Sequence, residues 1–133
     1  MDRESIIDFI LDHYESPRHF GAIADPTITR TGVNPGCGDI VTIFLQADGE
    51  AISKISFEGE GCTISQAGAS VITEMFAGKT LSEIENLPGS AILDLFGRDI
   101  AGTRFKCALL GLDTAQKAVR ALREGTEAGQ ESS

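Results

Sequence analysis

The sequence predicts an α+β fold in which a small antiparallel three-stranded sheet packs against several helices. Helical periodicity governs the start and the second half of the chain, whereas two adjacent runs between them have the character of strands. Helices and strands thus occupy separate blocks, which is typical of this class. The chain has 133 residues, the size of one ordinary domain. We expect one domain over residues 1–123 and a disordered tail at 124–133, which lacks large apolar residues.

The first helix is predicted over residues 5–15. Ile6, Phe9 and Ile10 recur at helical spacing, and Ser5 is in the position of an N-cap. We expect the face with these apolar residues to lie in the core. Any part of that face left exposed would be a docking surface for a partner protein.

Two strands and the turn between them are predicted next. Residues 40–45 are rich in β-branched side chains, and residues 52–57 alternate apolar with polar side chains. Residues 47–50 contain the Asp-Gly pair that favours hairpin turns, so the two strands should pair antiparallel. A shorter run at 27–31 would complete the sheet.

The second half of the chain is predicted to be helical. Apolar spacing over 64–76 indicates one helix, and the Thr-Leu-Ser-Glu run at 80–83 is a capping box that opens a short second one. An apolar cluster follows at 92–96. The last helix is expected over residues 106–123, with its apolar positions facing inward.

Charge and composition exclude several classes of function. The chain has 11 Lys and Arg against 20 Asp and Glu, a formal net charge of −9, which argues against nucleic acid and against an anionic membrane surface as partners. No apolar run approaches the ~18 residues of a membrane span, and the acidic start is unlike a signal peptide. We therefore expect a cytoplasmic protein whose three cysteines stay reduced.

The cysteines are candidates for metal ligands or reactive thiols. Cys37 lies in a turn-forming stretch before a strand, Cys62 between a strand and a helix, and Cys107 at the start of the last helix. None belongs to a CxxC pair, so spacing alone is a weak metal signal. Asp39 could supply a fourth ligand on the same side of an extended segment as Cys37. Three thiolates and a carboxylate suit Zn²⁺ or an iron–sulfur cluster better than Mg²⁺ or Ca²⁺.

The surroundings of two of these thiols favour the thiolate form. Helix N-termini should lower the pKa of Cys62 and Cys107. Arg104 and Lys106 would add positive charge beside the second of them. A less specific interpretation stays open, in which each cysteine is a small buried apolar residue, the carboxylate belongs to a turn, and the cations are solvated.

His13 and His19 are the two histidines of the chain, and both lie near the first predicted helix. We interpret them as surface or packing residues rather than catalytic bases, because they are distant in sequence from every cysteine.

Three segments in order resemble the cysteine motifs of the IscU/SufU/NifU-N-terminal iron–sulfur scaffold family. They are Asn-Pro-Gly-Cys-Gly-Asp at 34–39, Gly-Glu-Gly-Cys-Thr-Ile-Ser at 59–65 and Arg-Phe-Lys-Cys-Ala at 104–108. Residues 12–21 also resemble the end of the family's first helix, and the similarity covers most of residues 5–122. The resemblance implies an α+β scaffold that takes sulfur from a cysteine desulfurase and iron from an iron donor. It would assemble a [2Fe–2S] cluster and pass it to apo iron–sulfur proteins or carrier proteins.

The resemblance also implies the site residues. Carried over by motif, the ligands of the cluster or metal are Cys37, Asp39, Cys62 and Cys107. The sulfur acceptor, which would carry a persulfide, is Cys37 or Cys107. The carboxylate is a harder and more exchangeable ligand than a thiolate, as a site that releases its cargo requires.

Departures from the motifs place the chain between two branches of this family. Lys106 stands where IscU proteins usually have His, and residues 100–104 differ from the chaperone-recognition motif, so docking to an Hsp70-type chaperone is not supported. The third cysteine motif resembles that of SufU, but the interval after Cys62 leaves little room for the SufU insertion. The alternative function is therefore a zinc-dependent sulfurtransferase that holds Zn²⁺ in the same site and activates the desulfurase. A purely structural zinc module is a third hypothesis.

Overall fold

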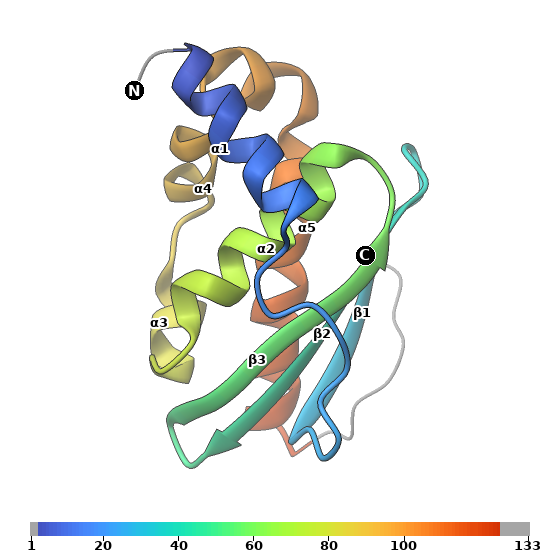
Figure 1. Ribbon diagram of the computed structural model, residues 1–133. Helices are drawn as coiled ribbons and strands as arrows, with labels where there is room; N and C mark the ends of the chain where they lie inside the picture. Colours follow the sequence, from blue (N-terminus) through green and yellow to red (C-terminus); the bar gives the residue numbers. More distant parts are fainter. Residues whose placement is uncertain (1–2, 126–133) are drawn as a thin grey trace.

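The computed structural model describes residues 3–125, except for the side chains at 98–101 and 103. The chain forms the predicted α+β fold, a three-stranded antiparallel sheet with helices (Figure 1). In chain order the elements are α1 (Arg3–Glu15), β1 (Ile28–Asn34), β2 (Asp39–Asp48), β3 (Ala51–Glu60), α2 (Thr63–Phe76), α3 (Leu81–Asn86), α4 (Gly89–Phe96) and α5 (Arg98–Arg123). No helix within the described residues is both long and apolar enough to cross a membrane.

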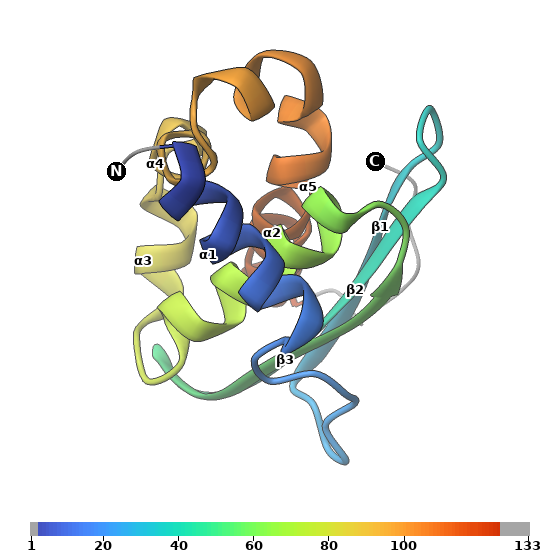
Figure 2. The same cartoon turned by 45° about the horizontal axis from the view of Figure 1, so that its top comes forward.

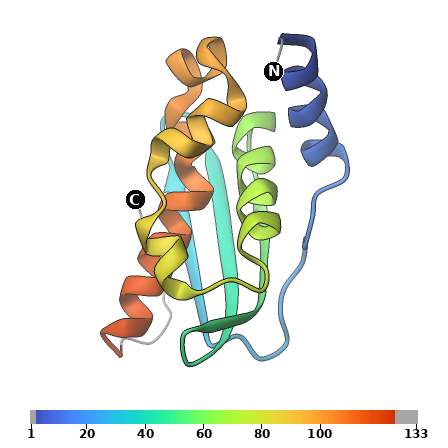
Figure 3. The ribbon, with the colours of Figure 1, turned by 90° about the vertical axis from the view of Figure 1, so that its left-hand side faces the viewer.

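The sheet has the order β1-β2-β3, and both neighbouring pairs are antiparallel. Helices α2 and α5 cover one face of it, with α5 against β1 and β2 and α2 against β3 (Figure 3). Side chains alternate between the two faces of a strand. Val41, Ile43 and Leu45 of β2 therefore point to the helices and are fully buried, while Ile40 on the other face is exposed.

Helices α2 and α5 approach one another through glycines. A Cβ atom at Gly68 of α2 would lie 2.7 Å from the carbonyl oxygen of Ala108, and one at Gly111 of α5 would lie 2.9 Å from the Cα atom of Ala69. Both distances are too short for a real side chain, so glycine is required at each position for this helix packing. The close contact fixes the residue before Ala108, which is Cys107, against the start of α2.

The first helix packs on α2, on the side away from α5 (Figure 3). His13 is buried in this contact, as expected of a packing residue, and its Nδ1 atom lies 2.8 Å from the Ser70 hydroxyl. Its Nε2 atom lies 3.5 Å from a carboxylate oxygen of Glu74. Burial lowers the pKa of His13. The other histidine, His19, is exposed.

Several element boundaries differ from those predicted. Helix α1 begins at Arg3, so Ser5 lies inside the helix and is not its N-cap. The last helix begins at Arg98, earlier than expected, but Arg104 has non-helical backbone angles (φ −128°, ψ 31°) that divide it at a kink. Periodicity could not reveal the first part, because it carries few apolar residues. Of the predicted tail, residues 126–133 lie outside the described part of the chain.

Other local predictions are confirmed. Thr80 caps α3 and forms a capping box with Glu83. The hairpin turn after Asp48 contains Gly49 at φ +62°, a conformation that glycine adopts without strain. The apolar cluster predicted at 92–96, after α3, forms part of α4, and its residue Phe96 is fully buried.

Candidate metal centre

Three parts of the chain meet at one end of the molecule and bring the cysteines together. The turn between β1 and β2 carries Cys37, the junction between β3 and α2 carries Cys62, and the kink of α5 precedes Cys107. Figure 1 shows the β1–β2 turn projecting at the upper right, and Figure 2 shows α5 bending before its long segment begins. Cys37 and Cys62 lie at element boundaries, as predicted, whereas Cys107 lies inside α5, just after the kink at Arg104, and not at the start of the helix.

The distances define a compact group of candidate ligands. Potential ligand atoms of Cys37, Asp39 and Cys107 all lie within 4.8 Å of one another, and the two Sγ atoms are 3.7 Å apart. Cys62 contacts the carboxylate of this group, because its Sγ atom lies 3.8 Å from Oδ2 of Asp39. The structure thus brings all four predicted site residues together.

The carboxylate of Asp39 occupies the middle of the group and is fully buried. Its Oδ1 atom accepts a hydrogen bond from the backbone N–H of Cys62 at 2.8 Å, which leaves Oδ2 turned to the thiol. Gly61 makes this possible, because it has φ +139° and a Cβ atom there would collide with the carboxylate. The glycine before Cys62 is therefore required by the close approach of Asp39.

Cys62 is the N-cap of α2. Its Sγ atom accepts the backbone N–H of Ser65 at 3.5 Å, and the Ser65 hydroxyl donates to the carbonyl oxygen of Cys62 at 3.0 Å. The first of these bonds satisfies an N–H group at the helix N-terminus that has no partner within the helix. Both bonds hold the sulfur at the start of the helix.

The prediction of a lowered pKa at Cys107 is wrong. Burial is the main cause of a raised pKa at this thiol, and contacts with Asp39, Cys37 and Cys62 raise it further. Arg104 and Lys106 are exposed, and an ion pair of either with the site is absent among the described residues. Because metal ligation requires the thiolate, binding of a metal at Cys107 must release a proton.

Asn34 belongs to the site but was not singled out from the sequence. Its side-chain Nδ2 atom lies 3.7 Å from Sγ of Cys107, within the range of an N–H···S hydrogen bond. Its backbone oxygen accepts the N–H of Cys37 at 3.1 Å and closes the turn. The Asn-Pro-Gly-Cys run signals this turn, but the amide contact depends on α5, which is distant in sequence.

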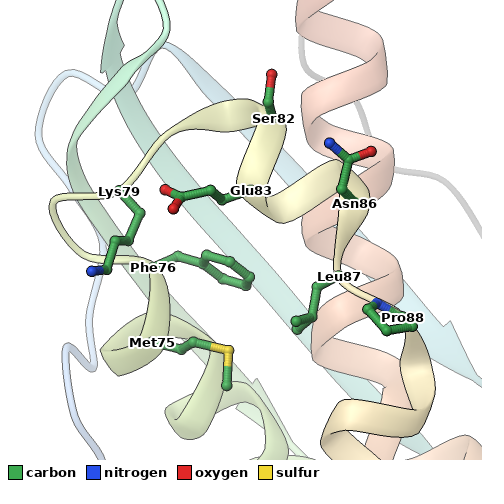
Figure 4. Close-up of a pocket in the computed structure, with 8 residues that line it drawn as sticks. All are labelled: Met75, Phe76, Lys79, Ser82, Glu83, Asn86, Leu87 and Pro88. Carbon is green, nitrogen blue, oxygen red and sulfur yellow. The ribbon is translucent and has the colours of Figure 1, made fainter.

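Two hollows of the surface differ in their relation to the thiols. One of about 400 Å³ lies between the end of α2 and α3, at the opposite end of α2 from Cys62, and has an apolar floor (Figure 4). A second of about 440 Å³ adjoins the site, because Gly61 forms part of its wall. Its other lining residues are Tyr14, Pro17, Phe20, Phe57, Gly59, Glu60 and Gln66.

Comparison with known proteins identifies the family of the chain. The model of the NifU-like N terminal domain matches residues 6–128. The chain belongs to this family. Over 112 residues it is 32% identical to the iron–sulfur cluster assembly scaffold protein IscU 1 of Archaeoglobus fulgidus, and the match covers 84% of this chain and 72% of that protein. Over 72 residues it is 40% identical to the zinc-dependent sulfurtransferase SufU of Bacillus subtilis, a match that covers 54% of this chain and 48% of that protein.

Solved structures of this family share the fold. A putative iron–sulfur cluster assembly scaffold protein for the SUF system from Fervidobacterium islandicum superposes with a TM-score of 0.73 at 30% identity, covering 89% of this chain and 99% of that one. The N-terminal NifU-like protein of Brucella abortus gives a TM-score of 0.74 at 22% identity, which supports the fold alone. The resemblance inferred from the three cysteine motifs is confirmed.

Proposed function

We propose that this NifU-N family protein is a scaffold for iron–sulfur cluster assembly. It receives sulfur from a cysteine desulfurase and iron from an iron donor, builds a [2Fe–2S] cluster, and transfers it to apo-proteins or carriers. The observation that carries the proposal is the convergence of Cys37, Cys62, Cys107 and the buried Asp39 from three distant segments. Relatives that share the family bear the name of such scaffolds.

The donor set fits an iron–sulfur cargo. Thiolates are the usual ligands of such clusters, and one harder ligand among them makes the cargo easier to release. Asp39 is suited to that role, because Oδ1 accepts the Cys62 N–H while Oδ2 lies 3.8 Å from Sγ of Cys62. Glycines beside Cys37 and Cys62 leave space around the two sulfur atoms.

Exposure distinguishes the two candidate sulfur acceptors. Cys37 is exposed in the turn, whereas Cys107 is 2% exposed. A partner's persulfide can therefore reach Cys37 first. The Cys37 thiolate would attack the outer sulfur of that persulfide, the S–S bond would break, and the desulfurase thiolate would leave. Cluster formation then requires ferrous iron and electrons from an external reductant.

The exposed side of α1 offers a docking surface for the desulfurase. Ile7, Leu11 and Tyr14 follow one another at helical spacing and are 42–43% exposed. The face of Ile6, Phe9 and Ile10 packs into the core, as predicted, and is not available for docking. Tyr14 also lines the hollow of about 440 Å³ that leads to Gly61. The apolar strip and the thiol site therefore form one continuous approach for a partner.

A second candidate is a zinc-dependent sulfurtransferase that activates the desulfurase. The match to a protein of that name favours it, and so does the sequence before Cys107, Arg104-Phe105-Lys106, which resembles the SufU motif. The same four ligands suit Zn²⁺. In this mechanism Cys37 would leave the zinc ion to accept sulfur.

An anaerobic reconstitution separates the two functions. The metal-free protein is mixed with a cysteine desulfurase, cysteine, ferrous iron and a thiol reductant, and an apo-ferredoxin is added afterwards. A visible cluster spectrum that then appears on the ferredoxin supports the scaffold. A colourless solution in which added zinc binds and desulfurase turnover rises supports the sulfurtransferase. Chelation that only unfolds the protein, with no sulfur transfer, would contradict both.

A further inference from the structure

Asn34 connects the turn that carries Cys37 to the helix that carries Cys107. It is the last residue of β1 and lies opposite Asp39 in the register of the β1–β2 pair. Its backbone oxygen accepts the N–H of Cys37 at 3.1 Å, while its side-chain amide donates to Sγ of Cys107 at 3.7 Å. The main chain and the side chain of one residue thus contact two of the three thiol-bearing segments.

We propose that Asn34 is a positioning residue that holds the Cys107 sulfur in the site while Cys37 exchanges. This inference rests on the proposed function, since it assigns different tasks to two of the ligands. The amide is a neutral donor, and sulfur accepts its N–H both as a thiol and as a metal-bound thiolate. Cys107 is buried on α5, where Asn34 restrains it, whereas Cys37 lies on an exposed turn.

The side chain of Asn34 is not needed to form the turn. The turn is closed by the backbone oxygen, which any residue would supply. A Cβ atom at Gly36 would lie 3.8 Å from Oδ1 of Asn34, an ordinary contact, so this oxygen is not tightly enclosed by the turn. The amide nitrogen therefore has a role that the fold of the turn does not explain, namely its contact with Cys107.

Asn34→Leu tests the role, because leucine keeps the branched shape and removes the donor. Asn86→Leu on α3 is the matched control, since Asn86 is exposed and lines the hollow at the far end of α2. Each variant is loaded with Co²⁺, and the thiolate-to-cobalt charge-transfer band is recorded. A thiolate without its hydrogen bond is easier to oxidise, so the band of Asn34→Leu should move to longer wavelength. Its Co²⁺ affinity should fall about tenfold, the low end of the effect of losing a hydrogen-bond partner of a metal ligand.

A second measurement works on the metal-free protein. Side-chain amide exchange in ¹⁵N-labelled protein should be slower at Asn34 than at Asn86, and Cys107→Ala should accelerate it severalfold. Cys62→Ala is the control and should leave it unchanged. The proposal would be overturned if the Asn34 amide exchanged as fast as that of Asn86, or if its exchange rate were unchanged in Cys107→Ala. An unshifted cobalt charge-transfer band in Asn34→Leu would overturn it as well. If the wild type binds no Co²⁺, the proposed function has failed, and the exchange experiment alone decides the role of Asn34.

Discussion

Replacement of Asp39 tests the assignment of the carboxylate as the ligand that allows release. Asp39→Ala removes both the negative charge and the acceptor of the Cys62 N–H, whereas Asp39→Asn removes the charge but retains an oxygen at Oδ1. The N–H bond at 2.8 Å is to a carboxylate, and a hydrogen bond to a charged group contributes ~1.5–3 kcal/mol. Asp39→Ala should therefore lower the free energy of unfolding of the metal-free protein by about 2 kcal/mol, and Asp39→Asn by less.

Both variants should release a bound cluster more slowly than the wild type. In the loaded state the buried carboxylate adds a negative charge to three thiolate ligands, and such a charge is unfavourable in a buried environment. Its loss should stabilise the loaded state and slow transfer on the order of tenfold, which corresponds to about 1.4 kcal/mol in the barrier. Because Asp39→Asn keeps the hydrogen bond, it separates this charge effect from damage to the fold.

The assay follows cluster transfer to an excess of apo-ferredoxin by visible circular dichroism. Urea unfolding of the metal-free variants is measured in parallel. Faster transfer from both variants would refute the role assigned to the carboxylate. Equal destabilisation by the two substitutions would show that the bond from Cys62 to Asp39 does not organise the turn as the structure indicates.

Three further predictions concern other parts of the molecule. Leu11→Asp should weaken desulfurase binding about tenfold in a binding titration, with no change in melting temperature, because the side chain is exposed. Gly61→Ala should lower stability by ~1–3 kcal/mol in urea and weaken Co²⁺ binding, because φ +139° is strained for alanine and the Cβ atom would displace Asp39. Arg123 lowers the pKa of Glu50 from 4.5 to about 2, so their pairing stabilises the fold above pH 4.5 and this contribution is lost as the pH falls towards 2. The difference in melting temperature between Arg123→Ala and the wild type should accordingly become smaller as the pH is lowered from 4.5 to 2, and an increase would contradict this.

Local chemistry explains which features could be predicted from the sequence. The capping box at Thr80, the Asp-Gly turn and the alternation along β3 are signals that neighbouring residues produce by themselves. The placement of Cys37 and Cys62 at element boundaries is of the same kind, because glycines and changes in periodicity mark those boundaries. The resemblance of the motifs then assigned Asp39 as a ligand together with the three thiols, an assignment that periodicity and spacing alone leave open.

The features that sequence reasoning missed depend on contacts between distant segments. The pKa of Cys107 is raised because the thiol is buried inside α5, where Gly68 and Gly111 let α2 and α5 approach closely, and not placed at the start of a helix as predicted. The Ile6, Phe9 and Ile10 face of α1 lies in the core, as predicted, but the exposure of Leu11 could not be predicted for a similar reason. Both sides of that helix carry apolar residues, and only the position of α2 decides that Ile10 is buried and Leu11 exposed.

The same long-range packing accounts for the division of tasks that we propose within the site. Cys62 is held by the first turn of α2, and Cys107 by the close contact of α5 with that helix. Cys37 lies instead on a turn between two strands, so it can move without disturbing the helix packing. A scaffold must hold its cargo and also accept sulfur from a partner, and these demands conflict if every ligand is equally rigid. With two thiols on packed helices and one on an exposed turn, acceptance can occur at Cys37 while the remaining ligands stay in place.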